Sequence, residues 1–329
     1  MNYLLYCIRR IDFKNWMRVS KNVAKRAHKP RALILLDMAQ CGLRYQIGYN
    51  DYDWDDFYML NHKQRKTMLS RGINNKIIAK YNNREFYKYF DDKGLFYKTY
   101  DEFLHRDWLD LRYADQEDLK KFIEKHSEFI VKPADGHGGA DVEKLSASPE
   151  DANELYKKLL DKGQNLVEEI IVQHKEMGRL HPESVNTMRI FSFFDGEKGH
   201  IVQAVLKMGR HNAITDNFSG GGLYTFLDND GVALYPATNS DGEIYEVHPQ
   251  SGTDIVGFKV PFIKEAFKMV VKASAVTPEM KYIGWDVAVT EDGPVIVEGN
   301  NIPGVFEPRG RFLKGKPGCL VRYRKYMDI

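Results

Sequence analysis

The chain has 329 residues, of which 43% are hydrophobic and 29% are charged, and its formal net charge is +2. This composition is typical of a soluble globular protein, and the apolar runs "YLLYCI" and "ALILL" are too short to cross a bilayer. The first residues lack a signal-peptide pattern, and Cys7, Cys41 and Cys319 lack metal-ligand spacing, so we expect a cytoplasmic protein with reduced thiols.

The N-terminal arm is basic, because Met1 to Arg31 holds nine Lys or Arg against the single acid Asp12. Trp16, Val19 and Val23 recur at helical spacing, which predicts amphipathic helices. The simpler interpretation is the outer face of a packed helical arm. The functional one is a platform for an anionic membrane surface, which would place the protein peripherally at the inner face of the membrane. No nucleic-acid-binding module is recognisable, so no nucleic acid partner is expected.

Periodicity divides the chain into a helical part and a part with strands. Residues 1–80 indicate helices, helical patterns continue to about residue 125, and strands alternate with turns from Glu128. "EFIVK", "DVEKL" and "LVEEIIV" are expected strands, and "SPEDANELYKKLLDKG" is a helix with its N-cap at Ser148. The hairpins are "TMRIFSFF" with "HIVQAVLKMG", "LYTFLD" with "VALYPA" and, after the helix "PFIKEAFKMVVKASA", "YIGWDVAVT" with "PVIVEGN". This mixture predicts an α+β fold with largely antiparallel sheets.

The last hairpin ends in polar residues. Its loop "EDG" predicts a three-residue connection with Gly293 in the left-handed conformation. That pairing puts Asp286 opposite Glu298, with Asn300 on the face of Glu298 and Asn301 pointing elsewhere. Two carboxylates and an amide oxygen in poorly hydrated surroundings suit Mg²⁺. The alternative is a pair of ordinary strand-end acids in water.

A glycine-rich loop follows the expected strand "EFIVK". "FIVKPADGHGGADV" combines Lys132 with Gly136, Gly138 and Gly139, whose backbone N–H groups can approach phosphate oxygens while the lysine adds a positive charge. The loop leads into another strand, which excludes a Walker A loop and a dinucleotide fingerprint, since both open a helix. Such a turn is often only a hairpin, but together with the acidic cluster it predicts a flap over a nucleoside triphosphate.

The order of these parts resembles the ATP-grasp superfamily over about residues 80 to 310. The shared features are a lysine at a strand end, a glycine flap, "LVEEII" and a final Asp, Glu and Asn set. "SVNTMRI", "DNFSGGG" and "IGWDVAV" resemble its sugar-transfer-associated group. The resemblance implies an ATP-grasp domain at 81–329, in which subdomains at about 81–165 and 166–329 clasp ATP, behind a basic helical region at 1–80.

The resemblance also implies roles for single residues. Those expected to bind ATP are Arg84, Lys132, Gly136, Gly138, Gly139, Glu168, Glu169, Ile171 and Gln173. Those expected to hold metal, two Mg²⁺ with Mn²⁺ as an alternative, are Asp286, Glu298 and Asn300. Lys132 would contact the α and β phosphates, Glu168 would accept from the adenine amino group, and Gln173 would bind the ribose. Arg84 stands where the family often has an earlier lysine.

ATP-grasp enzymes typically join a carboxylate to an amine through an acylphosphate. Arg189 and Arg210, on the two strands of one predicted hairpin, are the candidates for gripping the acid and stabilising the charge of the transferring phosphoryl group. The loop "DNFSGGG" could bind the acylphosphate through its N–H groups, or be a flexible turn. His181 and His211 are candidate bases or bystanders. The substrate contacts expected here are Asn217, Ser219, Gly220, Gly221 and Asn301.

The leading hypothesis is therefore an ATP-dependent carboxylate-amine ligase with small-molecule or saccharide substrates, in cell-surface polysaccharide or related biosynthesis. One alternative is a kinase that uses the same ATP site with a hydroxyl acceptor. The other is a non-catalytic nucleotide-binding scaffold whose basic arm docks on a membrane or a glycosyltransferase. The presence of Lys132 together with Asp286, Glu298 and Asn300 argues against the scaffold.

Overall fold

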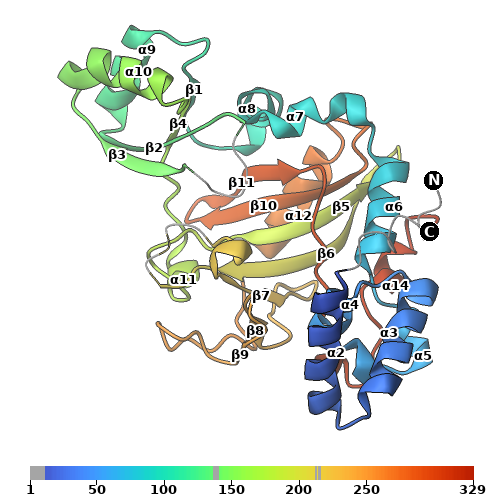
Figure 1. The fold of residues 1–329 in the computed structure, drawn as a ribbon. Coiled ribbons are helices and arrows are strands. Elements are labelled where there is room, and N and C mark those ends of the chain that lie inside the picture. Colours follow the sequence, from blue (N-terminus) through green and yellow to red (C-terminus); the bar gives the residue numbers. More distant parts are fainter. Residues whose placement is uncertain (1–11, 136–140, 212, 214–215) are drawn as a thin grey trace. The chain divides into compact units, whose positions relative to one another are not determined.

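The computed structural model describes residues 12–135, 141–211, 213 and 216–329 (Figure 1). The chain forms two compact units, one of residues 1–81 with 304–329 and the other of residues 82–303. The first boundary falls beside the division expected near residue 80. The C-terminal residues, which the sequence grouped with the preceding domain, belong instead to the helical unit. No helix in the described ranges is long and apolar enough to span a bilayer.

The helical unit is built on amphipathic helices around one core. Asp12 caps its first helix by accepting from the Asn15 backbone N–H at 3.0 Å. Val19 and Val23 of that helix are buried in an apolar cluster with Ile34 and other residues of this unit. The described part of the basic arm is therefore one layer of a packed helical unit. Its helices are α2 (Phe13–Ala27), α3 (Arg31–Tyr45), α4 (Tyr49–Trp54), α5 (His62–Arg65), α6 (Arg71–Tyr81), α13 (Gly310–Leu313) and α14 (Leu320–Tyr323), with the 3₁₀ turn η1 (Phe57–Met59).

Buried polar contacts attach the C-terminal segment to this unit. Glu307 accepts hydrogen bonds from the backbone N–H groups of Leu69 and Cys319, at 3.1 and 2.7 Å. Asp56, which is fully buried, pairs with Arg309 and Arg311. Contacts across such a long stretch of sequence carry no local signal, so the sequence analysis missed them.

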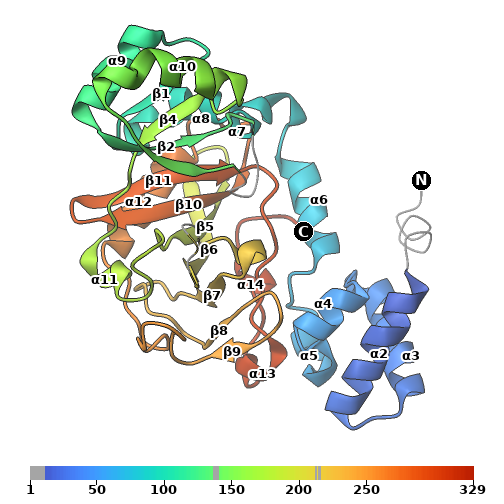
Figure 2. The same ribbon diagram turned by 60° about the vertical axis from the view of Figure 1, so that its left-hand side comes forward.

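The second unit begins with short helices and a four-stranded sheet. Helices α9 and α10 lie together on one face of this sheet (Figures 1 and 2), where Leu119 and Leu159 pack against Phe129 and Val131. The strand order is β1-β4-β2-β3, and every pairing is antiparallel. The elements are η2 (Arg84–Phe86), α7 (Lys88–Asp91), α8 (Lys93–Tyr100), η3 (Asp101–Phe103), β1 (Trp108–Asp110), α9 (Gln116–Lys125), β2 (Glu128–Lys132), β3 (Glu143–Ser146), η4 (Pro149–Asp151), α10 (Ala152–Asp161) and β4 (Leu166–Glu169).

A larger, seven-stranded sheet completes this unit, in the order β11-β10-β5-β6-β7-β8-β9. Its pairings are also antiparallel, so the α+β fold with antiparallel sheets is confirmed. Trp285 is fully buried in the core of this unit and donates from its indole to Ser192 at 2.8 Å. The elements are α11 (Lys175–Gly178), β5 (Met188–Phe194), β6 (Gly199–Met208), η5 (Phe218–Gly220), β7 (Leu223–Phe226), β8 (Ala237–Thr238), β9 (Ile244–Tyr245), α12 (Ile263–Ala273), β10 (Tyr282–Thr290) and β11 (Gly293–Asn300).

The β10–β11 hairpin has the predicted pairing but not the predicted loop. Thr290 pairs with Gly293, so the connection has two residues and the expected three-residue loop is wrong. A bulge then adds Val297 to β11, and the register shifts by one between Asp286 and Val287. Beyond the bulge, Asp286 lies opposite Glu298. The predicted three-residue loop without a bulge gives the same pair.

Candidate active site

The ends of β10 and β11 bring the predicted metal ligands together. Asp286 is buried and lies opposite Glu298. Asn300 lies two residues further on the same face, and its amide donates to Glu298 Oε1 and to the Gly284 carbonyl, both at 3.3 Å. Asn301 points elsewhere and donates to Asp91 Oδ1 at 2.9 Å. The face assignments from strand alternation are therefore correct, and Asn301 has a contact within the protein.

Two cations neutralise Asp286. Arg189 on β5 forms a bidentate pair with it, at 2.6 Å from Nε to Oδ1 and 2.8 Å to Oδ2. Lys207 on β6 lies 3.2 Å from both Asp286 Oδ1 and Asp216 Oδ1. Arg189 was expected near the site and lies in it. Lys207 was not predicted from the sequence. It lies inside an apolar strand, and the alternation of side chains along that strand does not tell a buried lysine from an exposed one.

The two carboxyl groups of this pair differ in their proton affinity. Burial acts to raise the pKa of Asp286, but Arg189 and Lys207 outweigh it and hold that pKa well below its usual range. The pKa of Glu298 is raised, first by burial and then by the negative charge of Asp286. Glu298 therefore holds its proton more tightly than a carboxyl group in water does.

This donor set fits a divalent cation. Mg²⁺ binds carboxylate and amide oxygens and usually keeps only one or two carboxylates from the protein. Asp286, Glu298 and Asn300 supply those oxygens on adjacent strands. The residues present thus agree with the metal site that the sequence predicts.

A buried charge network surrounds Lys132 at the end of β2. Its ammonium lies 2.5 Å from Glu168 Oε1 and 2.8 Å from the Tyr97 hydroxyl. Arg106 Nε donates to Glu168 Oε2 at 3.0 Å. Burial acts to raise the pKa of Glu168, but Lys132 and Arg106 outweigh it and lower that pKa to about 2. Lys132 is thus held by a carboxylate, and Glu168, expected to face adenine, is occupied by protein cations.

Arg106 also joins this network to the metal strand. Its NH1 donates to the Ile296 carbonyl at 2.8 Å, next to the bulge in β11. The four-stranded and seven-stranded sheets are therefore tied together one residue away from the bulge that sets the position of Glu298.

Lys93, at the start of α8, is close to the segment that follows Lys132, because its backbone N–H donates to the Ala134 carbonyl at 2.7 Å. The Asp92 side chain caps this helix by accepting from Leu95 N at 3.0 Å. The pKa of Lys93 is lowered, first by burial and then by the positive charge of Lys132, while Glu298 acts in the opposite direction. Lys93 was not among the residues predicted from the sequence. The sequence feature that could have identified it is a lysine directly after a helix-capping aspartate.

Arg84 was predicted to stand where the ATP-grasp family often has an earlier lysine. Its side chain is exposed. It belongs to the 3₁₀ turn η2, and its carbonyl accepts from the Tyr87 N–H at 3.2 Å. In the described part of the chain, no side-chain hydrogen bond or ion pair is recorded for it. Lys93 is therefore the better candidate for a phosphate contact.

Arg210 and the segment "DNFSGGG" lie near each other. Arg210 follows β6 and donates to the Tyr245 hydroxyl at 2.7 Å, and its NH2 is 3.7 Å from the position that a Cβ on Gly221 would take. The N–H groups of Gly220 and Gly222 both donate to the Asn217 carbonyl, at 3.0 and 3.1 Å, and Gly221 N–H donates to Phe218. These N–H groups are used inside a tight turn, which argues against their use in binding an acylphosphate.

Two further predicted residues are held by the protein itself. The Gln173 amide donates to the carbonyls of His181 and Ser184, at 2.9 and 2.7 Å, and accepts twice from Asn186. Its hydrogen-bonding groups are already occupied by the protein, so we do not propose Gln173 as a ribose contact. Buried His181 bonds to the Ser184 hydroxyl and the His211 carbonyl, which indicates a structural histidine.

The remaining expectations concern the adenine edge and the flap. The Glu169 N–H donates to the Asp107 carbonyl at 2.9 Å, and Ile171 is half-buried just after β4. Gly136, Gly138 and Gly139 lie outside the described residues, as does the side chain of Ser219.

The second unit thus combines two antiparallel sheets, a buried lysine on the smaller one and an acid pair with an asparagine on the larger one. Residues 151–309 match the family model described as sugar-transfer associated ATP-grasp. The match confirms the resemblance seen in the sequence. Proteins of the superfamily are mostly ATP-dependent ligases and typically use ATP and Mg²⁺.

Solved structures of ATP-grasp ligases are similar to the chain at low identity. The D-cycloserine synthetase DcsG is 14% identical with a TM-score of 0.41, and the match covers 78% of this chain and 76% of DcsG. The D-alanine-D-alanine ligase from Coxiella burnetii is 13% identical with a TM-score of 0.43, over 74% of this chain and 58% of that one. The ATP-grasp ligase PsnB, complexed with a minimal precursor, is 16% identical with a TM-score of 0.40, and the chain spans 58% of its length. At this level the similarities carry no information about substrates. No curated protein matches the sequence.

Proposed function

We propose that this protein is an ATP-dependent carboxylate-amine ligase that works through an acylphosphate. The observation that supports this most directly is the position of Arg106, which donates to Glu168 beside Lys132 at 3.0 Å and to the Ile296 carbonyl of the strand that carries Glu298 at 2.8 Å. The lysine proposed to bind phosphates and the carboxylates proposed to bind Mg²⁺ are thus connected through one side chain, which supports their action on one bound triphosphate.

In this proposal, Lys132 and Lys93 bind the phosphates of ATP. Glu168, held by Arg106 and Tyr97, keeps the Lys132 ammonium in position, since both Lys132 and Arg106 lie within 3.0 Å of its carboxylate oxygens. The phosphate-binding role of Gly136 and its neighbouring glycines and the adenine contacts of Glu169 and Ile171 remain part of the proposal.

Asp286, Glu298 and Asn300 would hold Mg²⁺, with Glu298 between the other two. When bound, Mg²⁺ offsets the negative charge on the phosphate oxygens and orients the terminal phosphoryl group. Arg189 shields Asp286 through two hydrogen bonds and adds a second positive charge beside that group.

The chemistry would take two balanced steps. A carboxylate oxygen of the acid forms a bond to the γ-phosphorus, and the bond from that phosphorus to the bridging oxygen of ADP breaks. The amine nitrogen then bonds to the acyl carbon, the carbon–oxygen bond to phosphate breaks, and the nitrogen loses a proton. The products are an amide, ADP and phosphate. Arg210, beside Gly221 and Tyr245, is the candidate for gripping the acid.

The proposed setting is the biosynthesis of a cell-surface polysaccharide or a related compound. The description of the matching family as sugar-transfer associated supports this setting, and small-molecule or saccharide acids and amines are the corresponding substrates. A basic helical unit that recruits the enzyme to a membrane or a glycosyltransferase belongs to the same proposal.

ADP release is the test. The purified protein with Mg²⁺ and ATP would be screened against amino acids, uronic acids and amino sugars, and then against the active acid with hydroxylamine in place of the amine. We expect acid-dependent ADP release and a hydroxamate, both lost in Glu298→Ala and retained in Arg84→Ala. A stable phosphorylated product would show a kinase instead, and Mg²⁺-ATP binding without turnover across the panel would favour a scaffold.

A further inference from the structure

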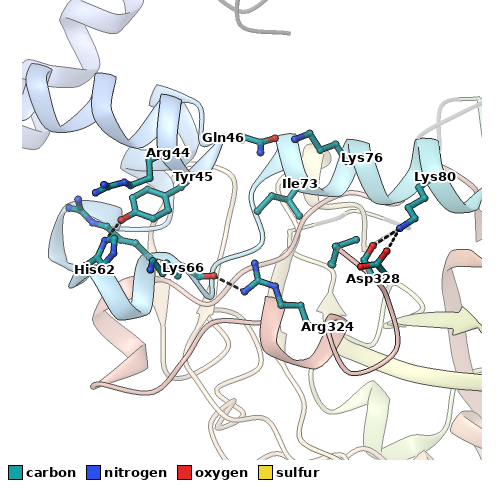
Figure 3. Close-up of a pocket in the computed structure, with 12 residues that line it drawn as sticks. Arg44, Tyr45, Gln46, His62, Lys66, Ile73, Lys76, Lys80, Arg324 and Asp328 are labelled. Carbon is teal, nitrogen blue, oxygen red and sulfur yellow. Dashed lines mark hydrogen bonds and ion pairs between the residues drawn. The ribbon is translucent and has the colours of Figure 1, made fainter. Parts of the chain in front are cut away.

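The helical unit contains a concave site with strongly positive walls. Its volume is about 610 Å³, which is in the range of small-molecule pockets. Three segments of this unit form it: the end of α3, the stretch from α5 through α6, and the residues after α14 (Figure 3). Its lining residues are Arg44, Tyr45, Gln46, His62, Arg65, Lys66, Ile73, Lys76, Lys80, Arg324, Asp328 and Ile329.

Most of the positive charge in this site is not neutralised. Six of the lining residues are Lys or Arg, whereas Asp328 is the one lining Asp or Glu. Lys80 pairs with Asp328 at 2.9 Å, and Arg65 pairs with Asp37, which lies outside the lining, at 2.6 Å. The other four cations form no recorded ion pair within the described ranges of the chain; they are Arg44, Lys66, Lys76 and Arg324. The whole chain has a net charge of only +2, so this concentration of charge does not follow from its composition.

The packing of the unit holds these cations around the concavity. Ile73, Lys76 and Lys80 follow one another at helical spacing along α6 and line the same side. Arg324 donates to the Lys66 carbonyl at 3.2 Å, which connects the residues after α14 to those after α5 (Figure 3). Like charges placed this close repel one another, and a bound polyanion would remove that cost.

Tyr45 and His62 form a polar group at one end of the site. Their side chains share a 2.5 Å hydrogen bond between the Tyr45 hydroxyl and His62 Nδ1. The pKa of His62 is lowered, first by desolvation and then by Lys66, Arg44 and Arg65, which face it from the surrounding segments. A smaller cavity of about 330 Å³ continues past the same side chains.

We propose that this concavity in the helical unit is a second binding site, separate from the ATP site, for a small anion that carries phosphate groups. Four uncompensated positive charges match the roughly 1.5 to 2 negative charges of each phosphate group better than the single charge of a carboxylate. Arg44 and Arg324 supply the forked donors that bind phosphate oxygens in pairs. The phosphate can belong to a soluble molecule or to a lipid headgroup. This inference rests on the helical unit alone and does not depend on the ligase proposal.

The test uses inorganic pyrophosphate as the probe and the full chain. Binding would be measured by calorimetry in wild type, in Arg44→Ala with Lys76→Ala, and in the matched control Lys14→Ala with Lys21→Ala, which removes two exposed lysines from α2. Each lost charge at the site should weaken binding roughly fivefold, so the pocket variant should bind roughly 25-fold more weakly and the control nearly as tightly as wild type.

His62 lines this concavity, so its ring protons give a signal from the proposed site itself. A pH titration by NMR should show that pyrophosphate raises the pKa of His62, because the anion offsets the neighbouring cations. A second arm would compare vesicles of phosphatidylcholine with vesicles that also contain phosphatidic acid. Binding of pyrophosphate at the site supports a soluble ligand, and pocket-dependent binding of phosphatidic acid alone supports a lipid headgroup. Equal affinity in the pocket and control variants for both probes, with an unchanged His62, would overturn the proposal.

Discussion

Replacement of Glu298 by Gln should separate the stability of this protein from its metal binding. In the folded protein Glu298 faces Asp286 across the hairpin, and both burial and Asp286 raise its pKa. The folded state therefore binds the Glu298 proton more tightly than the unfolded chain does. The stabilising contribution of this group is complete below its ordinary pKa of about 4.3 and is lost as the pH rises through the higher pKa of the folded state.

The size of the effect follows from the spacing of opposed residues. Two negative charges about 5 Å apart repel by about 3 kcal/mol at an effective dielectric constant of about 20. Arg189 and Lys207 act in the opposite direction on Glu298, and we expect about 1 kcal/mol of net destabilisation to remain at neutral pH. Glu298→Gln should therefore raise the melting temperature by about 2–4 °C in buffer without Mg²⁺.

The same variant should lose the response to ligand. Saturating Mg²⁺ and a non-hydrolysable ATP analogue should stabilise wild type by about 2.7 kcal/mol at 100 times the dissociation constant, and this gain should be mostly absent in Glu298→Gln. Differential scanning fluorimetry with and without ligand measures both effects. Asp292→Asn, in the exposed turn of the same hairpin, is the control and should change neither. A variant that melts below wild type without Mg²⁺, or that keeps the full ligand response, would refute this reasoning.

Three other predictions test separate parts of the structure. Lys93→Ala should weaken binding of Mg²⁺ and the ATP analogue roughly 10- to 100-fold, as expected for loss of a charge-assisted contact. Arg84→Ala should bind within about twofold of wild type by calorimetry. Equal losses in the two variants would contradict the choice of Lys93 over Arg84 as the phosphate contact. Burial raises the pKa of Glu307 to about 8, so wild type should lose stability as the pH rises from about 4.3 to 8. Glu307→Gln should flatten that decline in urea unfolding curves, and parallel curves would contradict it. A Cβ on Gly299 would lie 2.8 Å from Phe96 Cε2 and 2.9 Å from Phe90 Cδ1, so Gly299→Ala should lower the unfolding free energy by about 1–3 kcal/mol, and wild-type stability would show that the rings move aside.

The sequence predicted the site best where chemistry and periodicity agree. Alternation along β11 placed Glu298 and Asn300 on one face and Asn301 on another, and the structure has that arrangement. The opposition of Asp286 and Glu298 was also predicted, but from a three-residue loop. The structure reaches it with a two-residue loop and a bulge at Val297. Because side chains alternate with a period of two, a bulge shifts the register in a way that turn residues alone do not reveal.

Prediction was weakest for residues whose role depends on distant partners. Gln173 was expected to bind ribose, but its amide serves the loop that includes Ser184 and Asn186. Lys93 and Lys207 carried no motif, yet both are placed among the charges of the site. An exposed residue such as Arg84 and a half-buried one such as Lys93 look alike in sequence, since both begin short helical segments.

The sequence by itself determined the kind of elements and the chemistry that they carry. Strand alternation, the capping box at Ser148 and the order of lysine, glycine loop and acids are local properties. They predicted an antiparallel α+β protein and its resemblance to the ATP-grasp superfamily, which the family-model match over residues 151–309 bears out. Only the tertiary structure decided which charges meet. In the folded protein Glu168 pairs with Lys132 and Arg106, and residues 304–329 belong to the helical unit. The cations of the second site come from segments far apart in the chain. The physical reason is that burial and pairing depend on packing between distant residues, which hydrophobic periodicity does not encode.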